Sequence, residues 1–300
     1  CYPIYLLIKE SKGIKVINYK NKEDLINKIN KTNSSYKKLI IFVLFNGMFE
    51  SLDDFKNIKE SIKYDYISLL DAAMTPHLEN YGSYDYIVTN PRKFYRSALG
   101  AIVYIEKKRC FNFEYIVNPF FTFNYLLSKY LSRLLLSSRI FLLENLGIKI
   151  NQYSELNVPV KMDLLSLFFL KYMNFKYLRN ERVKQFNLYY KYLEPLKELF
   201  YFKNKPSLND CPFGFIIQSE KRDEIQIHLI KNRIYTSSLW QIPNKLKTEI
   251  GNEIVAKSNK ILVLPIGPQY SYFEIKRVCQ IILDFFKKYS KGSKSVSFKR

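Results

Sequence analysis

Apolar runs and amphipathic stretches alternate along the first 107 residues of the chain. The run KLIIFVLF at 38–45 is almost unbroken, as expected of a β-strand that is covered on both faces. Further strands are predicted at 14–19, 66–73, 84–90 and 101–107. Helical spacing predicts a helix at 21–33, and a serine followed by two acids predicts another at 51–63. This βα alternation predicts an α/β fold with a mostly parallel sheet.

The remainder of the chain changes character twice. Long aromatic and leucine-rich stretches predict that residues 111–200 are mainly helical. From about residue 212, the pattern predicts a strand, a helix and a strand. The final helix is predicted at 271–290. We therefore expect two domains, a large one at 1–185 that includes a helical connection and a small α/β domain at 186–300.

Polar side chains gather where two of the predicted strands end. Asp71 lies at the end of the strand 66–73, and Thr89 and Asn90 end the strand 84–90. Arg92 and Lys93 follow directly. Parallel sheets bind ligands beyond the carboxyl ends of their strands. The sequence therefore predicts that these polar groups converge on one edge of the sheet, with Lys93 directed either into a ligand cleft or into solvent.

Composition restricts the chemistry available to the chain. The four cysteines are far apart in the sequence and are interpreted as reduced intracellular thiols, and two histidines cannot make a multi-histidine metal site. The sequence contains neither a P-loop nor a GxGxxG motif. Chemistry must therefore rest on lysine, on a carboxylate or on a cofactor. Charged residues interrupt the most apolar stretch, 120–146, so we expect a buried helix there and a cytoplasmic protein without a membrane partner.

The formal net charge of +21 is compatible with nucleic-acid binding. The lysines, however, are spread along the whole chain, and Ile, Asn, Tyr and Phe are abundant with them. That mixture is typical of AT-rich codon usage, so the charge is interpreted as compositional. A positive surface would also help to gather a phosphorylated substrate.

Between residues 71 and 101 the sequence resembles a known family. A buried strand ending in LLDAA, a YDYIVTN strand, the Arg92-Lys93 pair and a turn ending in Gly100-Ala101 resemble the DegT/DnrJ/EryC1/StrS group. These are pyridoxal-phosphate-dependent aminotransferases of fold type I, many of which aminate nucleotide-linked keto sugars. Two later segments, IYTSSLWQIP and NKILVLPIGPQY, are similar to segments of a branch of that group associated with surface polysaccharides.

The resemblance implies a role for each polar residue at the predicted edge. Lys93 would be the catalytic lysine that joins the aldehyde of pyridoxal 5'-phosphate, and Asp71 would hold the pyridine nitrogen in its protonated form. Thr89, Asn90 and Arg92 would contact the cofactor phosphate. The resemblance also implies glutamate or a similar amino donor, a nucleotide-sugar substrate and a homodimer.

Three departures from the family pattern leave alternatives open. Met74 stands where the family has Gln or His, the second glycine is Ala101, and the chain begins at Cys1, after the family's N-terminal segment. The large domain is therefore expected to be incomplete at its N-terminus. A catalytically degenerate protein of the same fold, acting as a binding or scaffolding partner, is the second hypothesis, and a basic nucleic-acid-binding protein is the third.

Overall fold

A computed structural model describes residues 21–32, 35–55, 58–76, 84–94, 101–105, 164–238 and 252–294, with a few isolated positions between them. The chain divides into two compact units. The first unit joins Cys1–Ile67 to Lys176–Arg300, and the second unit is the intervening segment Ser68–Phe175. The domain boundary near residue 185 was predicted from a change in sequence pattern, whereas the two units are defined by contacts. The boundary stays a prediction.

The larger sheet is mostly parallel, which confirms the predicted fold class. Its strand order is β1-β2-β3-β4, the order in which the strands occur in the sequence. β2 (Ile67–Ala72) and β3 (Tyr86–Thr89) run parallel, and β4 (Ile102–Ile105) pairs with β3 in the antiparallel direction. β1 (Leu39–Val43) also lies where the sequence predicted a strand. The strand predicted at 14–19 lies outside the described segments.

The predicted helix at 21–33 is confirmed as α2 (Lys22–Asn30), whose first turn is capped by the side chain of Asn21. The helix predicted at 51–63 is instead divided into the 3₁₀-helix η2 (Phe49–Phe55) and the short helix α3 (Ile58–Ser61). The reason is the use made of Ser51. Its hydroxyl accepts the Phe45 N–H at 3.0 Å and donates to the Met48 carbonyl at 2.7 Å, so it binds the preceding turn and does not cap a following helix.

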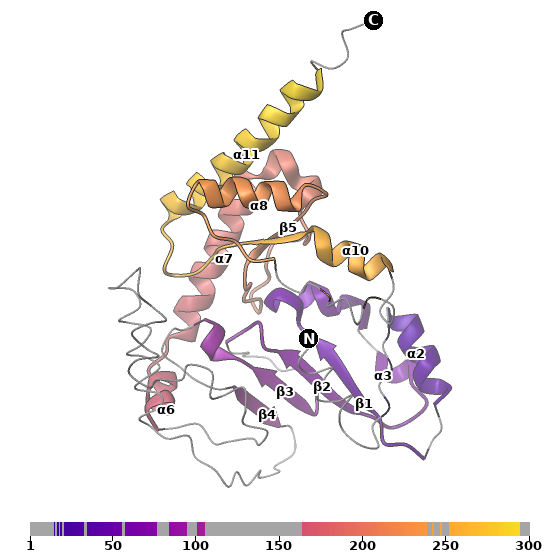
Figure 1. Ribbon diagram of the computed structural model, residues 1–300. Helices are drawn as coiled ribbons and strands as arrows, with labels where there is room; N and C mark the ends of the chain where they lie inside the picture. The colour runs from indigo at the N-terminus through magenta and orange to yellow at the C-terminus, as the bar shows by residue number, and fades with distance from the viewer. Residues whose placement is uncertain are drawn as a thin grey trace, which may run out of the picture. The chain divides into compact units, whose positions relative to one another are not determined.

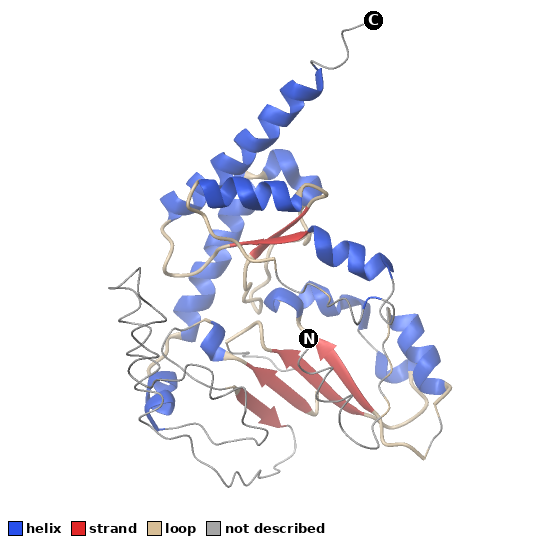
Figure 2. Ribbon diagram, in the orientation of Figure 1, coloured by secondary structure: helices blue, strands red, loops and turns tan. Residues whose placement is uncertain are grey.

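The first unit has a small antiparallel sheet of β5 (Phe215–Gln218) and β6 (Ile261–Leu264). Figure 1 shows α7 (Phe175–Tyr192), α8 (Arg222–Lys231) and α11 (Tyr272–Lys294) gathered around this sheet, and Figure 2 shows the same helices and strands in separate colours. The remaining helical elements are α6 (Leu164–Lys171) in the second unit, and η1 (Phe45–Gly47), η5 (Glu194–Leu199) and α10 (Asn252–Lys260) in the first.

Aromatic rings fill the centre of the first unit. The ring of Phe215 on β5 lies 5.1 Å from Tyr189 and 4.8 Å from Phe186, both on α7, and 5.0 Å from Phe200. All four side chains are buried. The Tyr189 hydroxyl donates to the Pro265 carbonyl at 3.0 Å, so the polar atom of this buried ring has a hydrogen-bond partner.

Asn46 joins two parts of the first unit that are 168 residues apart in the sequence. Its Nδ2 donates to the Gly214 carbonyl at 2.9 Å, and the Gly214 N–H donates to its Oδ1 at 3.0 Å. The side chain is completely buried. The main chain continues the pairing, because Phe213 N–H donates to Asn46 O and Cys211 N–H donates to Gly47 O. We call this set of bonds the Asn46 clasp.

The backbone at the clasp requires particular residue types. Asn46 and Gly47 have φ of 58° and 69°, in the left-handed region that asparagine and glycine tolerate best. Gly214 has no room for a side chain, since a Cβ there would overlap Cγ1 of Val263. Backbone conformation therefore favours asparagine and glycine at 46 and 47, and lack of space requires glycine at 214.

Two carboxylates extend the same connection. Asp210 Oδ1 accepts the Phe49 N–H at 2.6 Å. Glu50 accepts the backbone N–H groups of Lys203 and Asn204 at 3.4 and 3.3 Å. The Phe49 donor is half-buried and needs such a partner, whereas the bonds of Glu50 lie at the surface. Together the two acids link the loop before β5 to the segment that follows β1.

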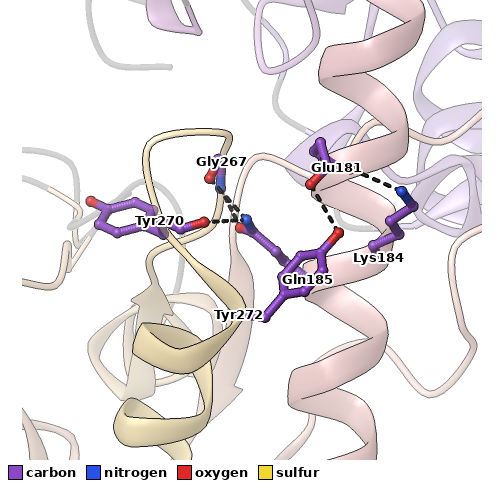
Figure 3. A network of polar contacts seen from close by, with 6 residues as sticks. All are labelled: Glu181, Lys184, Gln185, Gly267, Tyr270 and Tyr272. Carbon is purple, nitrogen blue, oxygen red and sulfur yellow. Dashed lines mark hydrogen bonds and ion pairs between the residues drawn. The ribbon is translucent and has the colours of Figure 1, made fainter.

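A second buried amide, Gln185 on α7, holds the loop after β6 (Figure 3). Its Oε1 accepts the Gly267 N–H at 2.7 Å, and its Nε2 donates to the carbonyls of Gly267 and Tyr270 at 3.0 and 2.8 Å. The side chain is fully buried, so water cannot replace any of these hydrogen bonds. The amide and its backbone partners therefore satisfy one another.

Next to Gln185, Glu181 connects α7 to the start of α11 (Figure 3). It accepts hydrogen bonds from Lys184 Nζ at 2.9 Å and from the Tyr272 hydroxyl at 3.0 Å. The bond from Lys184 is the main reason that the pKa of Glu181 is lowered. Because these groups face solvent, the pair contributes little to stability.

Among the helices that the structure describes, every one is too short or too polar to span a bilayer.

The Asn46 clasp predicts an unequal response to substitution. Asn46→Ala removes both side-chain bonds, leaves the buried Gly214 groups unpaired and places alanine at positive φ, so we expect unfolding free energy to fall by about 3 kcal/mol. Asn46→Gly tolerates the backbone and should lose about 1 kcal/mol less than alanine. Urea denaturation followed by circular dichroism measures both. The exposed Asn204→Ala is the matched control, with an expected change within about 0.5 kcal/mol; equal losses for all three variants would contradict the assignment.

Gln185→Glu tests the second amide through pH. The carboxylate would face two carbonyl oxygens in a buried site, which favours its protonated form and raises its folded-state pKa. A group with a raised folded pKa destabilises increasingly as pH rises above its unfolded value. We therefore expect the variant to lose stability between pH 4 and pH 8 relative to wild type, while Gln185→Leu shows a loss that pH does not change. Parallel melting curves for the two variants across that range would refute the geometry.

Candidate active site

The ends of β2 and β3 in the second unit lie side by side and are tied together by backbone bonds. Ala72, the last residue of β2, is in register with Thr89, the last residue of β3. Thr75, which is completely buried, donates its N–H to the Ala72 carbonyl at 2.9 Å and accepts the Asn90 N–H at 3.3 Å. Thr75 therefore fixes the loop that follows Asp71 against the turn that precedes Lys93.

Asp71 is held with one oxygen engaged. The residue is 9% exposed, and its Oδ1 accepts the backbone N–H of Ala73 at 3.0 Å. No described residue donates a hydrogen bond to Oδ2. The carboxylate is thus oriented by its own loop, and its second oxygen has no donor among the residues that the structure describes.

The turn after β3 is built to display two cations. Pro91 and Phe94 are buried and anchor the 3₁₀-helix η3 (Pro91–Lys93), while Arg92 and Lys93 are exposed. The Lys93 N–H donates to the Asn90 carbonyl at 3.2 Å, and the Phe94 N–H donates to the Pro91 carbonyl at 2.9 Å. The backbone of the turn is therefore fixed at both ends, while Arg92 and Lys93, taken as whole residues, remain accessible to solvent.

Asp71 and Arg92 both act electrostatically on the amine of Lys93. The pKa of Lys93 is lowered, chiefly because its amine is partly desolvated. Asp71 opposes this change by favouring the charged amine, and Arg92 adds to it by repulsion. The predicted proximity of Asp71 and Lys93 at the edge of the sheet is in accord with this coupling, and at a given pH more of the lysine is uncharged than in an ordinary lysine.

Two polar atoms at this edge lack partners. The Thr89 side chain is completely buried, and neither its Oγ1 nor the buried Oδ1 of Asn90 has a hydrogen-bond partner among the described residues. Leaving a buried polar atom unpaired costs about 1–3 kcal/mol. Two such atoms on consecutive residues at the end of a strand are a feature of ligand sites rather than of packed cores.

The register qualifies the predicted convergence. Asp71 pairs with Val88, whereas Thr89 pairs with Ala72. Because successive side chains of a strand point to opposite faces, Asp71 and Thr89 belong to opposite faces of the sheet. The polar groups meet at one edge, as expected, but Thr89 reaches that edge from the other side.

Sequence reasoning missed the two residues that position the site. Thr75 acts through its backbone, so its side-chain type gave no indication of the link to Asn90. Phe94 anchors the turn as a single buried ring in a polar stretch, and one apolar residue among charged neighbours carries too little pattern to be recognised. Gly100 and Trp240, which belong to the motifs that carry the family resemblance, lie outside the described residues.

Comparison with known proteins was made at the level of sequence and of structure. No protein-family profile matches the chain, and no curated protein is significantly similar to it in sequence. Solved structures do match. A DegT DnrJ EryC1 StrS aminotransferase from Brucella abortus superimposes with a TM-score of 0.57 at 18% identity, covering 88% of this chain and 69% of that one.

Two further structures agree with the first. A putative sugar aminotransferase from Streptococcus pneumoniae matches with a TM-score of 0.56 at 13% identity, over 91% of this chain and 72% of that one. DesI, whose structure was determined in the presence of its TDP-sugar product, matches with a TM-score of 0.53 at 13% identity, over 99% and 74%. The expectation from the sequence is thereby confirmed at the level of architecture: the chain has the fold of the DegT/DnrJ/EryC1/StrS aminotransferases.

Proposed function

We propose that the chain is a pyridoxal-phosphate-dependent aminotransferase that transfers an amino group to a nucleotide-linked keto sugar in surface polysaccharide biosynthesis. The observation that carries this proposal is that a buried carboxylate, Asp71, ends β2 while Lys93 lies on the turn after the neighbouring strand β3, at the carboxyl edge of a mostly parallel sheet, and that the pKa of Lys93 is lowered. A perturbed lysine beside a specific charge partner is a mark of functional sites. The shared fold supports the same reaction class.

The residues at the edge fit pyridoxal phosphate. Asp71 Oδ2 is the oxygen without a described donor, and a protonated pyridine nitrogen is such a donor. Asn90 can donate to a phosphate oxygen if its amide presents the NH₂ group. The Thr89 hydroxyl can donate only to a phosphate that reaches the face of the sheet opposite to Asp71. When bound, the cofactor supplies an aldehyde that carries the amino group and a ring that withdraws electrons from the reacting carbon.

The chain's own residues then have distinct tasks. Asp71 keeps a positive charge on the ring nitrogen, because a carboxylate at hydrogen-bond distance favours the protonated ring. Lys93 would provide the amine that attaches to the aldehyde carbon and afterwards carries a proton. Arg92 offers an exposed cation for a phosphate or carboxylate of the substrate.

The substrate, donor and assembly are parts of the same proposal. DesI was crystallised with a TDP-sugar product, and this supports a nucleotide-linked sugar as the amino acceptor. Glutamate is the proposed amino donor. We propose a homodimer in the cytoplasm, as the resemblance to fold type I enzymes implies.

Lys93→Ala tests the assignment of the lysine. The wild-type chain mixed with pyridoxal phosphate should develop visible absorbance, and borohydride reduction followed by peptide mass spectrometry should find the cofactor on Lys93. Lys93→Ala should abolish the band and lower amino transfer from glutamate to a TDP-keto sugar at least about 10³-fold. Lys171→Ala, an exposed lysine on α6, is the control. A wild-type protein that stays colourless, or labelling spread evenly over the lysines, would refute the proposal.

Asp71→Asn tests the carboxylate separately. The asparagine keeps a similar shape but cannot hold the ring nitrogen in its charged form, so we expect the cofactor still to attach to Lys93 while amino transfer falls on the order of 100-fold. Single-turnover kinetics of the half-reaction with glutamate separate this loss from weaker binding. A half-reaction as fast as wild type would show that Asp71 does not contact the ring.

A further inference from the structure

The first unit contains a cavity of about 550 Å³. Its lining comes from the end of η5 and the loop that follows it, from the loop between β5 and α8, from the last residue of α10 and from α11. A volume of this size is typical of small-molecule sites. Asp71 and Lys93 belong to the second unit, so the cavity shares no residue with the site proposed for the cofactor.

Hydrogen bonds of the main chain fix the segments that line the cavity. The Ser219 N–H donates to the Lys260 carbonyl at 3.0 Å, and the Lys221 N–H donates to Ser219 Oγ at 3.1 Å. In the loop after η5, the Tyr201 N–H donates to the Ile216 carbonyl of β5 at 3.1 Å. The lining is therefore held in one arrangement before any ligand binds, which lowers the entropic cost of binding.

Two neutral polar groups in the lining are left over by the fold. Gln218, the last residue of β5, is half-buried, and its side-chain amide has no hydrogen-bond partner among the described residues. Ser219 is 9% exposed; its Oγ accepts the Lys221 N–H, and no residue in the described part of the chain accepts its proton. Both side chains can donate a hydrogen bond to an oxygen atom. The cavity therefore offers two donors to a ligand.

Charged side chains in the lining favour an anion. Lys203, Lys221 and Lys260 contribute three positive charges, and Glu198 and Glu220 contribute two negative ones, which leaves one positive charge in excess. Glu220 is already compensated, because its carboxylate forms an ion pair with the Lys260 amine. A phosphate or carboxylate of a ligand would balance the remaining lysines.

An aromatic ring with a fixed orientation also lines the cavity. Tyr201 is 36% exposed, yet its ring centroid lies 5.2 Å from that of Phe45 and 5.0 Å from that of Phe202. These contacts restrict the rotation of the ring. Phe286 of α11 adds a second, half-buried ring. Aromatic rings held in this way bind planar bases by stacking, and one stacked base contributes about 1–3 kcal/mol.

We propose that the cavity binds a nucleoside phosphate, with the planar base stacked on Tyr201 and the phosphate held by Ser219 and Lys221. This inference goes beyond the proposed function and does not depend on it, because no lining residue belongs to the unit that carries Lys93. A phosphate alone would leave the aromatic ring uncovered, and an uncharged nucleoside would leave the lysines without an anion. A ligand with both parts uses the whole lining.

Four substitutions have different expected effects on the binding of AMP. Lys221→Gln removes a cation from the lining and should weaken binding about fivefold, while Lys231→Gln removes the same charge from the other end of α8, outside the cavity, and should change nothing. Glu198→Gln removes an acid and should strengthen binding about twofold. Tyr201→Leu should weaken it about tenfold through loss of stacking.

Isothermal titration calorimetry of the full chain measures the binding of AMP, adenosine and inorganic phosphate. We expect AMP to bind with a dissociation constant below about 1 mM, and each of the other two probes to bind at least about tenfold more weakly. Circular dichroism verifies the fold of each variant. Should Tyr201→Leu not fold, the opposite responses of Lys221→Gln and Glu198→Gln still decide, because loss of structure cannot strengthen binding.

Several results would overturn the proposal. They are a wild-type chain that does not bind AMP below about 1 mM, inorganic phosphate that binds as tightly as AMP, and equal losses in Lys221→Gln and Lys231→Gln. A folded Tyr201→Leu with unchanged affinity would do the same. Failure of the proposed function has another signature: AMP then binds as expected, while pyridoxal phosphate forms no adduct at Lys93.

Discussion

The exchange of hydrogen bonds between the Asn46 side chain and the Gly214 peptide unit is the constraint on which the first unit depends. A primary amide has the donor and acceptor geometry of a backbone group, so Asn46 behaves as an extra strand residue that pairs across 168 positions of sequence. It is completely buried, and alternative registers would leave its polar atoms without water or partner. The apolar core beside it, including Met48 and Phe215, can then pack in one way.

Gln185 applies the same principle at another place. It pairs with both backbone groups of Gly267 and with the Tyr270 carbonyl, and so specifies the path of the loop between β6 and α11. Aromatic packing around Phe215 supplies most of the apolar burial but tolerates small shifts, whereas the amides do not. The first unit therefore combines an apolar core that tolerates small shifts with two buried amides, Asn46 and Gln185, whose hydrogen bonds require a defined geometry.

In the second unit, the polar atoms are arranged for the opposite purpose. Asp71 keeps one oxygen without a described donor, and the unpaired atoms of Thr89 and Asn90 lie at the same edge. Within the described part of the chain, these atoms depart from the rule that buried polar groups find hydrogen-bond partners. Sequences depart from such rules mainly where a ligand completes the structure, and here the departures gather on two neighbouring strand ends and the turn that displays Lys93.

The sequence was sufficient for those parts of the structure that depend on local pattern. Apolar runs located β1 to β4, and the rule for carboxyl ends of strands brought Asp71 and Lys93 to one edge. It could not show that Thr89 occupies the opposite face, because this depends on register between strands. The helix predicted at 51–63 was wrong because the hydroxyl of Ser51 binds backward to Phe45 and Met48. The Asn-Gly pair at 46–47 indicates positive φ. That Asn46 pairs with Gly214 could not be predicted, because the two residues are 168 positions apart in the sequence.

The separation between Asn46 and Gly214 has a consequence for biosynthesis. A ribosome adds about 5–20 residues per second, so after Asn46 is made, roughly 10–30 s pass before Gly214 exists to receive it. During that interval β1 can pair with β2, its neighbour in the larger sheet, but the Asn46 side chain has no partner at Gly214. The buried hydrogen bonds of the Asn46 clasp can therefore form only after the whole second unit has been synthesised.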